Sequence, residues 1–356
     1  MTTQTLVARR PAMLSPAVDF LCVGGLSILI SLAVLLSGYR LPVQYALGMY
    51  VVNFLINAPH FLVSYRLLYG APQRRQDYQA VSLYVPLALL LYALFALAVY
   101  DSSPAVLGAM VGTGTILLAW HYTGQAYGMM ASFGFIEGLR FDAVERRLLR
   151  ANLYTLLGWH VSWAVVAQRK LFDPISGGST LLSPDLASNL YRVATLLALA
   201  SGLLGVVALV HLRRRTGRLP TAPMLAPWIA IHLWYVLLYK EPAAIFWAQN
   251  AHALQYLLFT MRVEMNRRER ESSHASLPRH MLVYYLGTVI LGLLVMQLVP
   301  ELTQLAAARL GFGFLPLQLS VVAFINVHHY FIDNFIWKIR NPVVQRDLFS
   351  HLMPNR

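Results

Sequence analysis

The chain has 356 residues, of which 58% are hydrophobic and only 12% are charged, and its formal net charge is +13. Soluble domains carry about 45–50% apolar and about 25% charged residues, so the composition excludes a soluble globular protein and a disordered chain. The single cysteine, Cys22, excludes a small scaffold held by disulfides. The basic residues lie between long apolar runs, which excludes a nucleic-acid-binding protein. We therefore predict an all-α, polytopic integral membrane protein.

A membrane-spanning helix needs about 20 mostly apolar residues, and ten stretches of the sequence meet this need. In chain order they are 17–38, 43–69, 81–100, 104–134, 150–168, 191–211, 223–239, 243–262, 281–298 and 314–337. At Lys240–Pro242 a charged pair followed by proline predicts a tight turn between two helices.

These spans divide the chain into a leader of residues 1–16, one transmembrane domain of residues 17–337 and a tail of residues 338–356. The first span is longer than the apolar region of a signal peptide, so we expect it to be retained as an anchor. The loops are too short to contain a separate soluble domain.

The distribution of basic residues predicts the orientation. In the ten-span arrangement, 22 of the 28 Lys and Arg residues lie on the side that holds both termini. Cytoplasmic loops carry the excess of Lys and Arg in membrane proteins, so we predict that the leader and the tail are both cytoplasmic. The runs Arg213–Arg215 and Arg267–Arg268 on that side indicate contacts with anionic lipids.

Ionisable residues inside membrane spans are costly and usually mark function, and in this chain most of them are histidines. Seven lie within predicted spans: His60, His121, His160, His232, His252, His328 and His329. Three of these are ten residues from a basic residue at the cytoplasmic flank, which corresponds to a depth of about 15 Å at the helical rise. The pattern predicts one layer of histidines in the cytoplasmic half of the membrane.

Several of these histidines have polar neighbours at helical spacing. Asn53, Asn57, His60 and Ser64 fall on one face of their helix, as do His121 and Gln125. Gln249, His252 and either Gln255 or Tyr256 share a face beside Asn250, and Asn326, His329 and Asp333 share another. His160 and His232 have only aromatic neighbours at such spacing, so we interpret them as packing residues.

Neutral imidazole is a common metal ligand, and its second ring nitrogen needs a polar partner that fixes the tautomer. We therefore predict a site for iron, copper or zinc with His60, His121, His252 and His329 as ligands. Amides expected to orient these ligands are Asn57, Gln125, Asn250 and Asn326. Two further residues are expected to take part in the chemistry: Asp333, as a ligand or by orienting His329, and His328, in place of His329 or in the substrate pocket.

The sequence lacks the motifs of several enzyme classes. It contains no phosphate-binding loop, GxSxG, HExxH or CxxC motif. Of the histidine boxes of membrane desaturases only the pair His328–His329 is present. Asp333 is the one carboxylate at the depth of the histidines, which argues against a carboxylate-bridged di-iron site.

Three short stretches, Pro59–His60, His121–Gln125 and Asn250–His252, resemble the layout of the bacterial Brp/Blh-type integral-membrane β-carotene dioxygenases. That family is all-helical, and histidines from separate helices hold one iron that cleaves a carotenoid to retinal. The chain departs from the family at Phe61, where Gly followed shortly by Asp is expected, and in its ten spans. The resemblance implies a non-haem iron oxygenase that uses O₂ on an apolar isoprenoid or lipid entering from the bilayer, in a bacterial inner (cytoplasmic) membrane.

Two other classes of function stay open from the sequence. One is a haem-b protein that transfers electrons to or from quinone, with axial histidines from pairs of helices. The other is a transporter that moves protons or a metal ion through the histidine layer. The sequence offers no inverted repeat or paired broken helices in support of the second.

Overall fold

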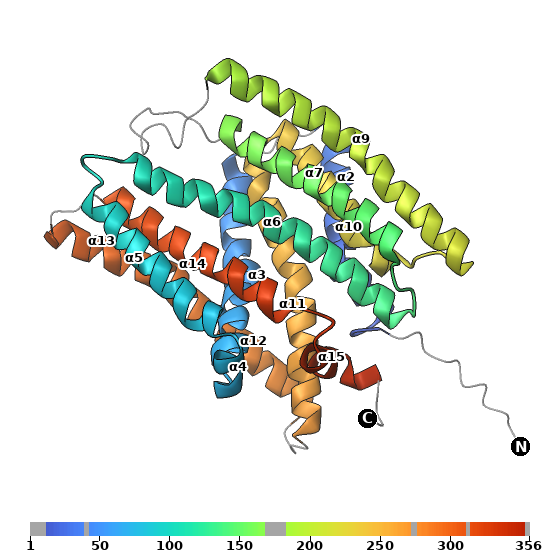
Figure 1. Cartoon of the computed structure of the whole chain (residues 1–356). Helices are drawn as coiled ribbons and strands as arrows, with labels where there is room; N and C mark the ends of the chain where they lie inside the picture. The colour runs from blue at the N-terminus through green and yellow to red at the C-terminus, as the bar shows by residue number, and fades with distance from the viewer. Residues whose placement is uncertain (1–11, 39–42, 168–182, 272–275, 311–313, 353–356) are drawn as a thin grey trace, which may run out of the picture.

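The computed structural model describes residues 12–38, 43–167, 183–271, 276–310 and 314–352 (Figure 1). Within these ranges the regular structure is entirely helical, which confirms the predicted all-α class. A helix occupies most of each of the ten predicted ranges, and the chain leaves the helical conformation at Glu241, as predicted for the turn at Lys240–Pro242. Most of the leader, residues 1–11, lies outside the described residues.

The helices and helical turns follow one another along the chain. They are α1 (Pro16–Phe20), η1 (Leu21–Gly25), α2 (Leu26–Ser37), α3 (Val43–Tyr69), α4 (Pro72–Asp77), η2 (Ala80–Tyr84), α5 (Val85–Ala98), α6 (Ala105–Ile136), α7 (Ala143–Ala167), α9 (Pro184–Thr216), α10 (Ala222–Lys240), η3 (Pro242–Ala244), α11 (Ile245–Arg270), α12 (Leu277–Leu293), η4 (Leu294–Leu298), α13 (Val299–Leu310), α14 (Phe314–Ile336), α15 (Pro342–Phe349) and η5 (Ser350–Leu352).

Six helical segments in the described residues are long and apolar enough to cross a membrane. They are Pro16–Ser37, Ala80–Ala98, Ala105–Ile136, Pro184–Thr216, Ala222–Lys240 and Leu277–Thr303. Among the other long helices, α3, α11 and α14 carry the polar faces noted in the sequence. The chain is therefore a multi-pass membrane protein by the length and composition of its helices.

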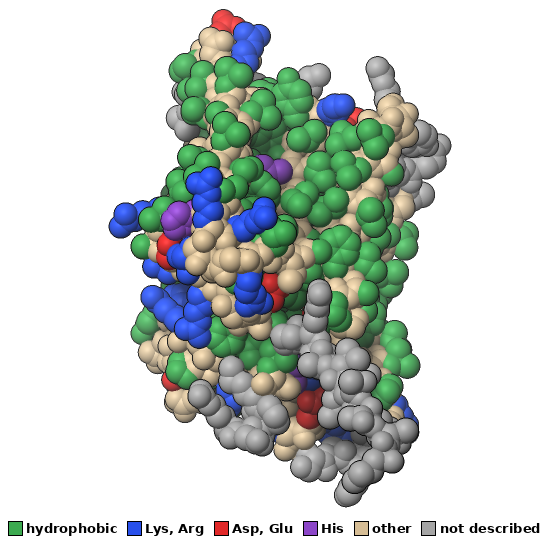
Figure 2. Space-filling model, turned by 90° about the vertical axis from the view of Figure 1, so that its right-hand side faces the viewer, with side chains coloured by type: hydrophobic (Ala, Val, Ile, Leu, Met, Phe, Trp, Pro, Cys, Tyr) green, Lys and Arg blue, Asp and Glu red, His purple; other side chains and the backbone are tan. Residues whose placement is uncertain are grey.

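The outer helices present apolar side chains to the surroundings. On α9, Leu196, Leu199 and Leu203 are each 68% exposed, and hydrophobic side chains cover much of the face in Figure 2. A protein surrounded by water rarely exposes so much contiguous apolar surface, whereas the hydrocarbon of a bilayer accepts it.

The polar helices lie inside this shell. Figure 1 shows α3 and α11 passing through the middle of the bundle, with α7, α9 and α10 on one side and α5, α12, α13 and α14 on the other. Helix α6 packs against α10, α7 and α14, so it joins the two sides. This arrangement brings the polar faces of α3, α6, α11 and α14 together.

The residues after α14 fold back onto the bundle. Asn266, near the end of α11, donates hydrogen bonds to the backbone carbonyls of Asp347 (2.9 Å) and Leu348 (3.0 Å) of α15. The Asp347 carboxylate also forms ion pairs with Arg74 and Arg270. Within the described part of the predicted tail, α15 is therefore docked over one end of α11.

A kink in the first membrane helix lets α10 approach closely. Gly24, within η1, has φ +150°, a conformation that residues with a Cβ rarely adopt. A Cβ there would lie 2.7 Å from the Ala226 carbonyl oxygen and 2.9 Å from the Ala230 Cβ. In this widened turn the Val23 carbonyl accepts a hydrogen bond from Gln255 Nε2 (2.6 Å) of α11.

Replacing Gly24 with alanine should lower stability by about 1–3 kcal/mol, because the added methyl group would clash with α10 in a fully packed region. Thermal unfolding of the purified protein in detergent measures the change. The control is Gly202→Ala in α9, where a Cβ meets nothing within 4 Å and alanine favours the helix. Equal unfolding temperatures for the two variants would contradict the prediction.

Candidate metal centre

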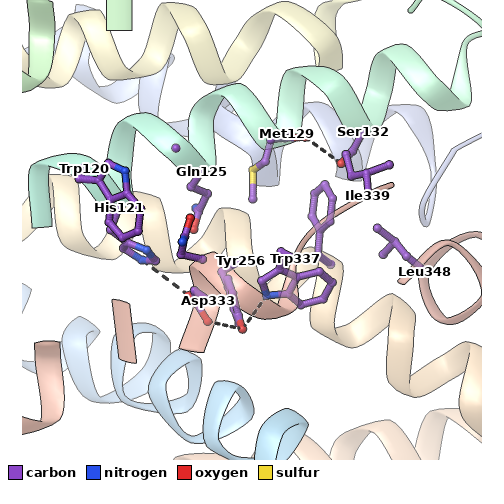
Figure 3. A pocket seen from close by; sticks show the side chains of 14 residues that line it. Trp120, His121, Gln125, Met129, Ser132, Tyr256, Asp333, Trp337, Ile339 and Leu348 are labelled. Atoms are coloured by element: carbon purple, nitrogen blue, oxygen red, sulfur yellow. Dashed lines mark hydrogen bonds and ion pairs between the residues drawn. The ribbon is translucent and has the colours of Figure 1, made fainter. Parts of the chain in front are cut away.

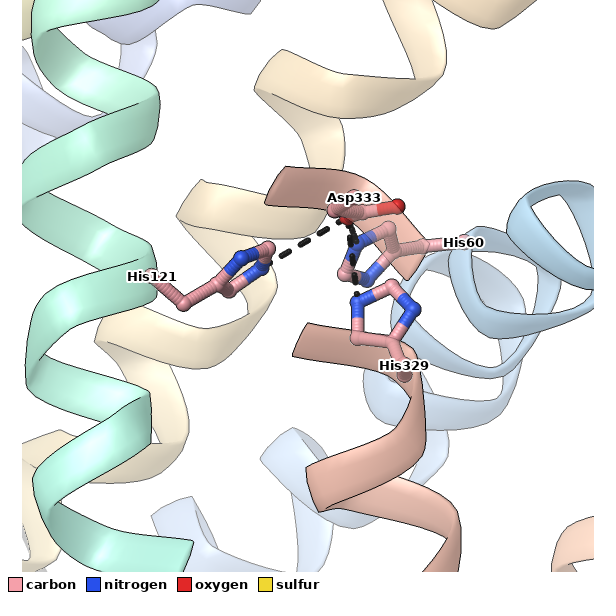
Figure 4. Close-up of side chains that lie close together, drawn as sticks. All are labelled: His60, His121, His329 and Asp333. Atoms are coloured by element: carbon pink, nitrogen blue, oxygen red, sulfur yellow. Dashed lines mark ion pairs between the residues drawn. The ribbon is translucent and has the colours of Figure 1, made fainter. Parts of the chain in front are cut away.

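Four side chains from three helices converge in the middle of the bundle. They are His60 of α3, His121 of α6, and His329 and Asp333 of α14 (Figure 4). One ligand atom from each lies within 4.8 Å of the corresponding atoms of the others, and all four side chains are buried. His329 and Asp333 are four residues apart, so one face of α14 carries both.

The ligand atoms face one carboxylate oxygen. Asp333 Oδ2 lies 3.3 Å from His329 Nε2 and 3.7 Å from both His60 Nε2 and His121 Nε2. Among the described residues, Asp333 Oδ2, His60 Nε2 and His329 Nε2 have no hydrogen-bond partner. Ligands bound at about 2.0–2.2 Å to a common ion lie about 3–3.6 Å from their neighbours. The 3.3 Å separation falls within this range and the two of 3.7 Å lie just above it, so the side chains are close to the spacing that shared coordination needs.

The other oxygen of Asp333 is held by hydroxyl groups. Asp333 Oδ1 accepts hydrogen bonds from Ser64 Oγ (2.7 Å) and from the Tyr256 hydroxyl (2.8 Å). Trp337 Nε1 donates in turn to the Tyr256 hydroxyl oxygen (2.9 Å). These bonds fix the carboxylate so that Oδ2 is directed at the histidines.

His252 of α11 lies beside the group. Its Nε2 is 2.9 Å from His121 Nε2, and its ring centroid is 5.0 Å from that of His60. Two nitrogens at this distance can share one proton in a hydrogen bond or bind one ion as adjacent ligands, since adjacent ligands at about 2.0–2.1 Å are about 2.9 Å apart. The structure thus places all four histidines predicted as ligands within one cluster, while their role as ligands stays a prediction.

Pro59 shapes α3 immediately before His60. Proline has no N–H, so the Leu55 carbonyl one turn earlier loses its helical donor. The Tyr285 hydroxyl of α12 donates to this carbonyl instead. The neighbouring helix therefore stabilises α3 at the residue that precedes the ligand.

Asn57, one turn before His60, orients that histidine. Asn57 Oδ1 lies 3.3 Å from His60 Nδ1, and Asn57 Nδ2 donates to Asn53 Oδ1 (2.8 Å). An imidazole whose Nδ1–H donates to an oxygen presents the lone pair of Nε2. The tautomer favoured by Asn57 is therefore the one that can bind an ion at Nε2.

Gln125 connects α6 to α11. Its Nε2 donates to the His252 carbonyl (3.0 Å) and to Gln255 Oε1 (3.1 Å). Because Gln255 also donates to the carbonyl of Val23, this amide chain ties the helix of His252 to the kinked first membrane helix.

The other two amides expected to orient ligands bond to backbone carbonyls. Asn250 Nδ2 donates to the Phe246 carbonyl of its own helix (2.9 Å) and to the Met49 carbonyl of α3 (3.5 Å), and Asn326 Nδ2 donates to the Val322 carbonyl of its own helix (2.8 Å). Asn326 Oδ1 accepts from the Tyr330 hydroxyl (3.1 Å). None of these bonds reaches a histidine of the cluster.

The tandem histidines diverge. His329 faces the cluster, whereas His328 Nε2 donates to the Val81 carbonyl (2.9 Å) and its ring packs against Tyr65 and Tyr69. Adjacent residues lie about 100° apart around a helix, so only one of the pair can face the centre. His328 therefore lies outside both the cluster and the lining of the cavity beside it.

His160 and His232 lie between α7 and α10. His160 Nδ1 is 3.2 Å from the Tyr235 hydroxyl, and His232 Nδ1 is 2.7 Å from the Trp228 carbonyl. Both are thus bonded inside a layer rich in aromatic rings, as expected for packing residues.

A cavity of about 140 Å³ adjoins the cluster (Figure 3). It lies between α6, α11 and α14, with His121, Asp333 and Tyr256 at one end. Trp337, which the sequence analysis did not single out, lines it and also bonds to Tyr256. Its position four residues after Asp333 is the signal that would have identified it.

A second acidic group lies at the start of α7. Asp142 and Glu145 form a reciprocal cap, in which each backbone N–H donates to the other's carboxylate at 2.8 Å. The bond from the Glu145 N–H lowers the pKa of Asp142. Arg215 pairs with Glu145 at 2.9 Å and with Asp142 at 3.5 Å, so a side-chain cation already balances one of the two negative charges.

Comparison of the chain with protein-family models, with curated proteins and with solved structures finds no match.

Replacing Tyr256 with phenylalanine should lower stability by about 1–2 kcal/mol, because Asp333 Oδ1 and Trp337 Nε1 would each lose a buried partner. Thermal unfolding in detergent measures the effect. Tyr154→Phe is the matched control, since Tyr154 is 58% exposed. A destabilisation no larger than that of the control would contradict a stabilising role for the Tyr256 hydroxyl.

Proposed function

We propose that this protein is an integral-membrane metalloenzyme with one transition-metal ion held by His60, His121 and His329 together with Asp333 or His252. The observation that carries the proposal is the convergence of three unpartnered buried atoms: two imidazole nitrogens and one carboxylate oxygen. Each buried polar atom without a partner costs about 1–3 kcal/mol. A bound cation would satisfy all of them at once, which explains why these residues share the interior of a membrane protein.

The donor set supports iron as the ion. Imidazole nitrogens combined with one carboxylate oxygen are the ligands of non-haem iron oxygenases that keep open coordination positions. Iron bound in this way would supply the activation of O₂. The cavity beside His121 and Asp333 would give the end of an apolar isoprenoid or lipid chain access to the ion. The burial of the four ligand side chains would limit the access of water to the reaction.

The spacing of the histidines argues against haem. Ring centroids of His60, His121 and His329 lie 4.4–6.3 Å apart around one point. A haem with two axial histidines needs a flat slot wide enough for the macrocycle between the imidazoles, and this arrangement has its polar atoms where the slot would lie.

In the transporter alternative the histidines bind an ion or proton as it crosses the membrane. That alternative predicts uptake that depends on these histidines.

We also propose that all ten predicted helices span a bacterial inner membrane with both termini on the cytoplasmic side. The excess of Lys and Arg on that side supports this orientation, and so does the clustering of Arg74 and Arg270 around Asp347 at one end of the bundle. The basic runs at this end would contact anionic lipid head groups.

A fluorescent protein fused after Arg356 should fluoresce in bacterial cells, and alkaline phosphatase fused at the same point should be inactive, because both reporters would remain in the cytoplasm. Fusions placed after Lys240, in the turn before α11, should give the opposite result. Phosphatase activity from the C-terminal fusion would contradict the orientation.

Purified protein should contain about one iron per chain and show no Soret band. His329→Gln should lose the metal, because glutamine lacks the imidazole lone pair that is expected to bind the ion. Its neighbour His328→Gln should keep the metal, since His328 faces the Val81 carbonyl. Elemental analysis and ultraviolet–visible spectra of the three proteins measure this.

Equal metal content in His329→Gln and His328→Gln would contradict the proposed metal site. A Soret band would favour the haem alternative, and metal-dependent uptake into vesicles without any consumption of O₂ would favour the transporter. Iron-loaded wild-type protein that consumes O₂ only when apolar isoprenoids are added would support the oxygenase.

A further inference from the structure

The cavity beside the cluster runs along one face of α6. Trp120, Gly124, Gly128 and Ser132 are spaced by four residues, and all four line the cavity. A Cβ added at Gly124 or Gly128 would meet nothing within 4 Å. In contrast, a Cβ at Gly134 of the same helix would lie 2.4 Å from the Leu139 carbonyl oxygen. The wall of the cavity is therefore unobstructed at Gly124, which is exposed, and at Gly128.

The two ends of the cavity differ in chemistry. One end is formed by His121 and by Asp333, whose carboxylate is 5% exposed and whose Oδ2 has no partner in the described part of the chain. At the other end lie Ile339, after α14, and Leu348 of α15 (Figure 3). Between them the walls are mainly apolar and aromatic, as at Phe259.

The dimensions restrict the shape of an occupant. From His121 to Ser132 the helix rises about 16 Å. A volume of about 140 Å³ is close to that of a cavity that holds a single benzene ring. Over this length the space is narrow, and it is open on one side, where Gly124 is exposed. This suits the reacting end and adjoining part of a single linear chain, whereas a fused ring system is too wide.

We propose that this cavity binds a linear apolar chain, such as an acyclic isoprenoid, with its reacting end at His121 and Asp333. Gly124 and Gly128 are specificity-determining residues, because their missing side chains leave the width that the chain occupies. This inference rests on the proposed function for the identity of the reacting end, whereas binding of the chain depends only on the cavity.

Binding is measured with parinaric acid, a linear conjugated fatty acid whose fluorescence is excited by energy transfer from tryptophan. Trp120 and Trp337 line the cavity and would be the nearest donors. Wild-type protein in detergent should bind the probe saturably. Farnesol, a linear isoprenoid alcohol, should displace it, and cholesterol should not.

Gly128→Leu and Gly124→Leu should weaken binding of the probe at least tenfold, and Gly128→Ala should give an intermediate loss while favouring the helix. Gly112→Leu is the matched control, since this glycine of α6 also has open space around a Cβ but does not line the cavity. It should bind the probe like the wild type. Metal content is measured on every variant.

Unchanged affinity in Gly128→Ala and both leucine variants would overturn the inference, even if the wild type contains iron. Displacement by cholesterol as effective as that by farnesol would also overturn it. Loss of binding in the glycine variants with wild-type metal content would support it. Loss of binding in these variants from a protein that never contains metal would support the cavity inference while the proposed function fails.

Discussion

The structure depends on the polar groups that surround one buried carboxylate, that of Asp333. Asp333 lies in the interior of an apolar bundle, where an uncompensated charge or polar atom is expensive. Its Oδ1 accepts bonds from Ser64 and Tyr256, and its Oδ2 faces three imidazole nitrogens. Every polar helix contributes to this arrangement: α3 and α11 supply the hydroxyl donors, and α3, α6 and α14 supply the imidazoles. The packing of these four helices and the chemistry of the centre therefore have the same physical origin.

The helices divide into two groups for the same reason. Helices that carry the polar faces must lie inside, where the cluster and its amides satisfy one another, and the apolar helices α5, α9 and α12 can face lipid. Where a backbone carbonyl of a helix lacks its usual hydrogen-bond donor, a side chain of a neighbouring helix supplies one. Tyr285 donates to the carbonyl freed by Pro59, and Gln255 donates to the carbonyl in the widened turn at Gly24. Both compensating contacts come from other helices and hold the bundle together around the centre.

The extent of successful prediction differed between the fold and the site. The positions of the long helices followed from apolar run length and from breaks such as Lys240–Pro242, because the membrane leaves few alternatives to a helix. Their ends did not follow, since α9 and α11 continue past the apolar runs to Thr216 and Arg270. At the site, the prediction that His329 and Asp333 lie on one face of their helix is confirmed, because a separation of four residues places two side chains on the same side of a helix. Asn326 also lies on that face, yet it bonds to its own helix. Spacing along one helix cannot say which neighbour a side chain meets.

Composition and helical periodicity alone determined that the chain is an all-helical membrane protein and that several of its histidines share a helix face with polar residues. These properties are local, because they depend on run length and on the rise of a single helix. Only the tertiary structure decided that His329 rather than His328 faces the centre. It also decided that Ser64 and Tyr256 hold the carboxylate, with Trp337 bonded to Tyr256, and that a narrow cavity follows Gly124 and Gly128. Each of these depends on the rotation and contact of helices distant in sequence, which are set by the packing of the whole bundle.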